Sequence, residues 1–111
     1  MRGYMIDELT QEDIQRLGQA LKDMGLESSV LGLYWLDVPQ ELLSEEQAAH
    51  SESCGPHSMG LEVEENWIRM ELLVRARKII RCSCVAYATP EQREHMITYL
   101  DSLLADLDIK V

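Results

Sequence analysis

Three residues able to bind a metal or to act in catalysis lie close together near the middle of the chain. His50, Cys54 and His57 fall within the stretch HSESCGPH, where three and then two residues separate them. Imidazole nitrogens and thiolate sulfurs are frequent zinc ligands in proteins, and an acid such as Glu52 can supply a fourth. The stretch therefore indicates a zinc site, although it offers one ligand set where a strong zinc signature has two.

The same stretch begins like a thioredoxin-type redox turn. Cys54, Gly55 and Pro56 stand in the required order, but His57 takes the place of the second cysteine. Such a turn follows a strand and opens a helix, because the helix N-terminus stabilises the thiolate. Here a helical pattern precedes the turn and a strand pattern follows it, so the context argues against thiol redox chemistry.

Cys54 and His57 are also close enough in sequence for the imidazole to activate the thiol as a nucleophile. Nucleophilic catalysis needs further groups that orient the base and stabilise an oxyanion. The sequence shows neither, and it has no glycine-rich phosphate-binding loop. We therefore expect no catalytic residues and no cofactor, with zinc as the alternative.

Charge and composition limit the partners and the compartment. The 111 residues carry 20 acidic and 10 basic side chains, a formal net charge of −10. Nucleic-acid phosphates and anionic membranes repel so acidic a surface, so we expect neither as a partner. The 3 cysteines are an odd number and do not suggest a disulfide framework. The N-terminal residues turn acidic too early for a secretory signal. The longest apolar run is too short to cross a bilayer. These features predict a cytoplasmic protein.

The spacing of apolar residues predicts three helical segments and four strands. Thr10 and Asp13 form a capping pattern at the start of the first helix and Gly25 ends it, while Thr89 and Pro90 open the last helix. The apolar stripe of that last helix is expected at Met96, Leu100, Leu103 and Leu107. The expected elements are a helix over 10–24, a strand within 29–38, a polar helical stretch over 39–50, strands over 59–64, 67–75 and 79–87, and a helix from 90 onward.

The last three strands are predicted to form a meander with one buried face. A hairpin that turns at Glu65 and Asn66 brings the charges of Glu62 and Arg69 opposite each other. Its apolar pairs are Val63–Ile68, Leu61–Met70 and Met59–Leu72. A second hairpin centred on Arg77 continues the same face with Val74–Ile80, Leu72–Cys82, Met70–Cys84 and Ile68–Ala86. This register places both cysteines in the core as small apolar residues.

These elements predict a single α+β domain over residues 1–111, in the order α-β-α-β-β-β-α. We expect a mostly antiparallel four-stranded sheet with helices packed on one face. The strand order stays open, because no pattern fixes where the strand within 29–38 joins the sheet.

The other face of the sheet carries the leading functional prediction. In the same register it gathers aromatic, aliphatic and arginine side chains, namely Trp67, Leu73, Ile79, Val85, Tyr87, Arg69 and Arg81. Aromatic and arginine enrichment is typical of protein interfaces, although a helix could instead cover this face as a second small core. The leading interpretation is a non-enzymatic module that homodimerises or binds a protein partner through this face. The alternative is a zinc-binding protein or enzyme that uses His50, Cys54 and His57.

Overall fold

The computed structural model of the chain describes residues 2–111 and has the predicted α+β class. Helices pack with a largely antiparallel sheet of six strands, two more than expected. The strands are β1 (Gly3–Ile6), β2 (Leu33–Asp37), β3 (His57–Val63), β4 (Ile68–Glu71), β5 (Leu73–Ala76) and β6 (Ala86–Tyr87). The helices are α1 (Gln11–Asp23), the 3-10 helix η1 (Gln40–Leu42), α2 (Glu45–Ala49) and α3 (Pro90–Asp106). No helix within residues 2–111 is long and apolar enough to cross a membrane.

Strand β3 is the centre of the sheet. On one edge, Ser58 to Glu62 of β3 pair with all five residues of β2. On the other edge, the two ends of β3 pair with β4 and β5. The outer neighbours are β1 beside β4 and β6 beside β5, and every pair is antiparallel. The strand within 29–38, whose place the sequence left open, is therefore next to the first strand of the predicted meander.

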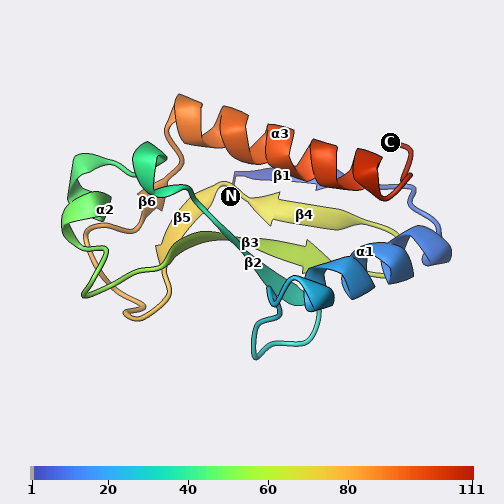
Figure 1. Cartoon of the computed structure of the whole chain (residues 1–111), viewed down its shortest axis with the longest axis horizontal. Coiled ribbons are helices and arrows are strands. Elements are labelled where there is room, and N and C mark those ends of the chain that lie inside the picture. Colours follow the sequence, from blue (N-terminus) through green and yellow to red (C-terminus); the bar gives the residue numbers. More distant parts are fainter. Residues whose placement is uncertain (1) are drawn as a thin grey trace.

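Both long helices pack on the same face of the sheet. Figure 1 shows α1 and α3 in front of the strands, and in the space-filling view they meet across that face. Arg16 of α1 joins them by donating a hydrogen bond to the carbonyl oxygen of Leu107, at the C-terminus of α3, over 2.9 Å. The fully buried residues between helices and sheet are Leu17, Leu21, Leu36, Met59, Leu61, Ile68, Met70, Val74, Met96, Leu100 and Leu104. Two of the three apolar pairs predicted for the first hairpin form, Val63–Ile68 and Leu61–Met70. The third, Met59–Leu72, is wrong, because the predicted strand over 67–75 is interrupted at Leu72 and β3 continues against β5 with Ser58 opposite Arg75.

The local signals for the helices are confirmed at their ends. Thr10 accepts a hydrogen bond from the Asp13 amide while the Asp13 carboxylate accepts one from the Thr10 amide, and Thr89 forms the same reciprocal cap with Gln92. Gly25 follows α1 with a φ of +74°, a conformation that favours glycine. The stripe of α3 is shifted slightly, because Leu104 is buried where Leu103 was expected.

Strand β1 was missed by the sequence analysis, which began the fold with a helix. Its residues pair with β4 from Gly3 opposite Glu71 to Ile6 opposite Ile68. The strand has four residues and lies at the sheet edge with alternate residues exposed, so its apolar pattern is too short to stand out.

The predicted strand over 79–87 is wrong except at its last two residues. Only Ala86 and Tyr87 form β6, and they pair with Val74 and Leu73 in place of the predicted partners. The pairs Val74–Ile80, Leu72–Cys82, Met70–Cys84 and Ile68–Ala86 therefore do not form. Residues 77–85, called the cysteine loop below, leave the sheet, and Ile80 in this loop is 86% exposed. The segment over 39–50 contains η1 and the short α2 in place of one continuous helix.

The contact between β1 and α3 predicts a specific alkaline transition. The Tyr4 hydroxyl donates to Asp101 Oδ1 over 2.7 Å, and this bond, with burial, raises the pKa of Tyr4 from 10.0 to about 12. A group with a raised native pKa contributes stability below its unfolded pKa, and this stability is lost as pH rises from 10 to about 12. In denaturant unfolding from neutral to alkaline pH, the stability difference between wild type and Tyr4→Phe should shrink across that window. A difference that does not change with pH would contradict the Tyr4–Asp101 bond.

Candidate metal centre

Four metal-binding side chains from two distant segments converge at one end of the molecule. The ligand atoms of His50, Cys54, Cys82 and Cys84 all lie within 4.8 Å of one another. His50 Nδ1 is 3.1 Å from Cys82 Sγ and 3.6 Å from Cys54 Sγ, and the two sulfurs of Cys54 and Cys82 are 3.5 Å apart. All three cysteines are free thiols.

These separations match the edges of a metal tetrahedron. A zinc ion with Zn–S bonds of about 2.3 Å and Zn–N bonds of about 2.0 Å has ligand–ligand distances of roughly 3.8 Å between sulfurs and roughly 3.6 Å between sulfur and nitrogen. The three distances among His50, Cys54 and Cys82 fall at or below these values, by up to about 0.5 Å. The Cys84 sulfur lies within 4.8 Å of the other three atoms, so it would have to move closer to complete a tetrahedron around one ion.

His50 and Cys54 are placed by the end of α2 and the turn that follows it. His50 is the C-cap of α2, and the Cys54 amide donates to the His50 carbonyl oxygen over 2.8 Å, so one helical turn brings both side chains to the same side. Gly55 then packs so tightly that a Cβ there would clash with the carbonyl oxygen of Ser51. Glycine at this position is what lets the chain turn closely behind Cys54.

The cysteine loop brings Cys82 and Cys84 to the same place. Its start is tied to the opposite segment by two backbone bonds, from the Arg77 amide to the Pro56 carbonyl over 3.1 Å and from the Lys78 amide to the Cys54 carbonyl over 3.0 Å. Further along, the Cys84 amide donates to Cys82 Sγ over 3.4 Å. A single residue between the two cysteines allows both sulfurs to point into the site.

Two buried glutamines connect the site to the N-terminus of α3. Gln47 Nε2 donates to the Cys84 carbonyl oxygen over 3.2 Å, and Gln92 Nε2 donates to Gln47 Oε1 over 2.9 Å. Gln92 also donates to the Leu42 carbonyl oxygen over 2.8 Å. A buried amide group is costly unless its hydrogen bonds are formed. This chain of hydrogen bonds therefore fixes the Cys84 backbone relative to α2, which carries Gln47, and α3, which carries Gln92.

His57 lies beside the cluster but is not one of its four converging ligands. Its Nε2 atom is 3.4 Å from Cys84 Sγ, and its Nδ1 atom is buried with no hydrogen-bond partner among residues 2–111. Burial, assisted by the nearby His50, lowers the pKa of His57, so the ring is neutral. A neutral ring protonated on Nε2 donates a hydrogen bond to a Cys84 thiolate, the usual role of a residue that supports a metal ligand.

The thiols are electrostatically unequal in the cluster. The Cys84 amide is the largest cause that lowers the pKa of Cys82 to about 6, whereas burial is the largest cause that raises the pKa of Cys84 to about 12. Cys82 is therefore the easier of the two to ionise, and Cys84 is the harder. A bound dication would offset the repulsion between thiolates and release the remaining protons.

The structure brings together two of the three residues that the sequence predicts as metal ligands. His50 and Cys54 are brought together, His57 is adjacent, and Glu52 is exposed outside the group. Cys82 and Cys84 were assigned to the core and instead complete the cluster. The signal that could have identified them is their own spacing, because two cysteines separated by one residue can bind the same ion.

The seven residues predicted for the interface fall into two groups. Trp67, Arg69, Leu73 and Tyr87 lie in or next to strands, and Leu73 pairs with Tyr87 between β5 and β6. The other three, Ile79, Arg81 and Val85, lie in the cysteine loop. Val85 packs against the small cluster of Cys54, Ala76 and Cys84.

Comparisons of the chain with protein-family models, curated proteins and solved structures found no match.

The geometry predicts that His57 supports the site while Cys84 binds the metal directly. His57→Gln should retain one zinc ion per chain and lose about tenfold to hundredfold in affinity, the usual effect of removing such a supporting residue. Cys84→Ser should lose the tight site, because a ligand is removed. Competition with a zinc-binding dye measures both. Loss of the site in His57→Gln with little effect of Cys84→Ser would show instead that His50, Cys54 and His57 are the ligands.

Proposed function

We propose that this protein is a non-enzymatic zinc-binding module with one Cys3His centre formed by His50, Cys54, Cys82 and Cys84. The observation that carries the proposal is the convergence of four ligand atoms within 4.8 Å from segments about thirty residues apart in sequence. Apolar packing alone gives no reason for a histidine and three cysteines to meet in this way.

The ligand chemistry favours zinc. Three sulfurs and one imidazole nitrogen suit a borderline-soft ion, and calcium or magnesium would require oxygen ligands. A two-iron cluster divides its four ligands between two irons, whereas the observed separations of 3.1 to 3.6 Å fit the edges around one ion. Zinc with four protein ligands is the standard arrangement of structural sites.

A closed set of four ligands supports a structural role. Catalytic zinc sites have three protein ligands and keep the fourth position for water or substrate. Here Cys54 and Cys84 are buried, and the four clustered side chains would fill all four positions around a tetrahedral ion. We therefore propose that the zinc ion holds the cysteine loop and β6 in place, and that the protein acts by binding a partner through the sheet face away from the helices.

Zinc content tests the proposal directly. Protein purified under reducing conditions without chelator should contain one zinc ion per chain by elemental analysis, and His50→Gln should lose it. His95→Gln is the matched control, since His95 is an exposed histidine on α3 outside the cluster. Wild-type protein that remains metal-free after incubation with zinc, or that holds iron instead, would contradict a zinc centre.

Metal removal should affect one end of the molecule first. The cysteine loop contains no helix or strand and leaves Ile79 and Ile80 exposed, so chelation should raise hydrogen exchange at the amides of Lys78 and Val85. Amides in the β3–β4 ladder should stay protected, because the core around Leu61 and Met70 does not include the metal ligands. Unchanged exchange in the loop after zinc removal would contradict a structural role for the metal.

A further inference from the structure

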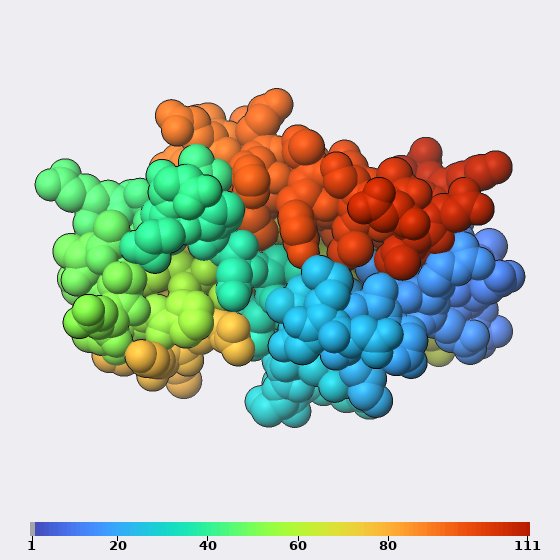
Figure 2. Space-filling model, viewed as in Figure 1, coloured from blue at the N-terminus to red at the C-terminus, as the bar shows by residue number. Residues whose placement is uncertain are grey.

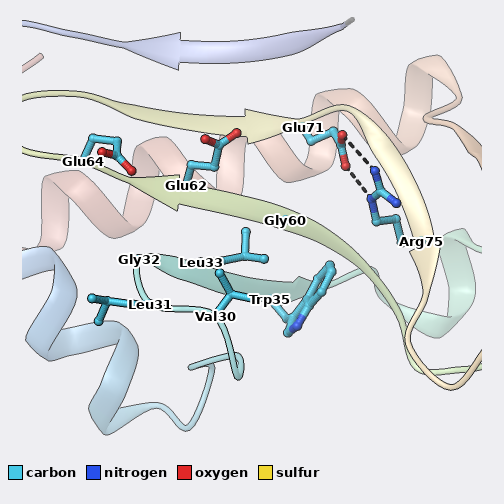
Figure 3. A pocket seen from close by; sticks show the side chains of 10 residues that line it. All are labelled: Val30, Leu31, Gly32, Leu33, Trp35, Gly60, Glu62, Glu64, Glu71 and Arg75. Carbon is cyan, nitrogen blue, oxygen red and sulfur yellow. Dashed lines mark hydrogen bonds and ion pairs between the residues drawn. The ribbon is translucent and has the colours of Figure 1, made fainter. Parts of the chain in front are cut away.

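A hollow of about 480 Å³ lies on the sheet face opposite the helices. Figure 3 shows its side chains projecting from the strands and from the turn before β2, with α3 behind the sheet. The residues that line this outer-face hollow are Val30, Leu31, Gly32, Leu33, Trp35, Gly60, Glu62, Glu64, Glu71 and Arg75. It draws on β2, β3, β4 and β5, and it includes none of the four proposed metal ligands.

The floor of the hollow is apolar and two aliphatic side chains stand at its rim. A Cβ on Gly60 would lie 3.3 Å from Leu33 and 3.7 Å from Trp35, so glycine leaves room for both side chains to lie over β3. Val30 is 59% exposed and Leu31 is fully exposed at the turn before β2. A fully exposed leucine beside an apolar floor is a surface that gains free energy when a second apolar group covers it.

The charged side chains around the floor leave an excess of negative charge. Arg75 is held by Glu71 through two contacts, of 2.7 and 3.2 Å, and Arg69 contacts Glu62 over 3.2 Å. Glu64 is exposed and forms no ion pair within residues 2–111. The arginines near the hollow are therefore already occupied, and the remaining attraction is for a cation.

Two features decide what occupies the hollow. A second copy of the chain would bring its own acidic rim and a formal charge of −10, and like charges across an interface are unfavourable. Strand addition at the outer edge of β2 is blocked, because the Trp35 amide donates to Leu26 and the Ser28 amide donates to Leu33 over 2.9 and 3.1 Å. A partner must therefore bind by its side chains on the face of the sheet.

We propose that the outer-face hollow binds a segment of a partner protein in which a large apolar side chain is flanked by arginine or lysine. The apolar side chain contacts Leu33, Trp35 and Leu31, and the flanking cations reach Glu64 and its acidic neighbours. The proposal rests on the binding role proposed above and names the chemistry of the partner. It does not require the metal to touch the partner.

Selection from random dodecapeptides displayed on phage tests this proposal with the zinc-loaded wild-type protein. The enriched peptides should combine arginine or lysine with large apolar residues, and their affinity should fall as salt is added. Leu31→Ser should weaken binding of an enriched peptide by about tenfold or more, through loss of apolar contact. Glu64→Gln should weaken it by about twofold to fivefold, the range of an exposed ion pair.

Matched controls lie away from the hollow. Ile80→Ser removes an aliphatic side chain that is also highly exposed, and Glu94→Gln removes an exposed carboxylate on α3, so neither should change peptide affinity. No enrichment, enrichment of acidic peptides, or equal binding by Leu31→Ser and wild type would overturn the proposal. A dimer in sedimentation that Leu31→Ser dissociates and Ile80→Ser does not would assign the face to a second copy instead.

Zinc analysis of each preparation separates the two proposals. Intact zinc content with no peptide selection overturns only the docking surface. Peptide selection by a wild-type protein that binds no zinc overturns only the metal centre.

Discussion

The convergence of Cys82 and Cys84 on His50 and Cys54 is the contact on which one end of this molecule depends. Residues 77–85 contain no helix or strand, and Ile79 and Ile80 within them are exposed, so little aliphatic surface of the loop is buried. Backbone bonds tie its start to Pro56 and Cys54, the Gln47 amide holds the Cys84 carbonyl, and the buried Cys84 packs in the cluster itself. Burial and the neighbouring thiols raise the pKa of Cys84, so a thiolate at this position is costly without a cation beside it. A bound dication removes that cost, which is why the same geometry supports both a metal and a structural role.

The rest of the fold is held by a different force. The inward faces of β2, β3, β4 and β5 pack against α1 and α3 in one apolar core that contains none of the four ligands. Gln47 and Gln92 link the two regions, since their buried amides connect the Cys84 carbonyl to the start of α3. On the face of the sheet away from these two helices, apolar and acidic side chains surround a hollow. The apolar core and the His/Cys cluster thus lie in different parts of the molecule, and the hollow on the outer face includes residues of neither.

The sequence predicted what is encoded by short-range pattern and missed what depends on distant contacts. The caps at Thr10 and Thr89 and the β3–β4 register with Glu62 opposite Arg69 follow from neighbouring residues, and the structure has them. The sequence analysis missed β1 because its four residues at the sheet edge form too short an apolar–polar alternation to be recognised. The prediction of a strand over 79–87 was wrong because the alternating apolar residues in 79–85 resemble those of a strand. The contact of Cys82 and Cys84 with residues some thirty positions earlier cannot be seen in the neighbouring sequence. For the same reason His50 and Cys54 could be proposed as ligands from their spacing, whereas Cys82 and Cys84 could be joined to them only by the fold.

X-ray absorption at the zinc edge of the reconstituted protein tests the central claim most directly, because it reports the ligand atoms themselves. Three sulfur neighbours at about 2.3 Å and one nitrogen at about 2.0 Å are predicted, with no metal neighbour. A shell dominated by nitrogen and oxygen would mean that the cysteines do not hold the ion together. A nearby second metal would mean that the cluster is not a single tetrahedral site. Either result would contradict the account of how the cysteine loop is held.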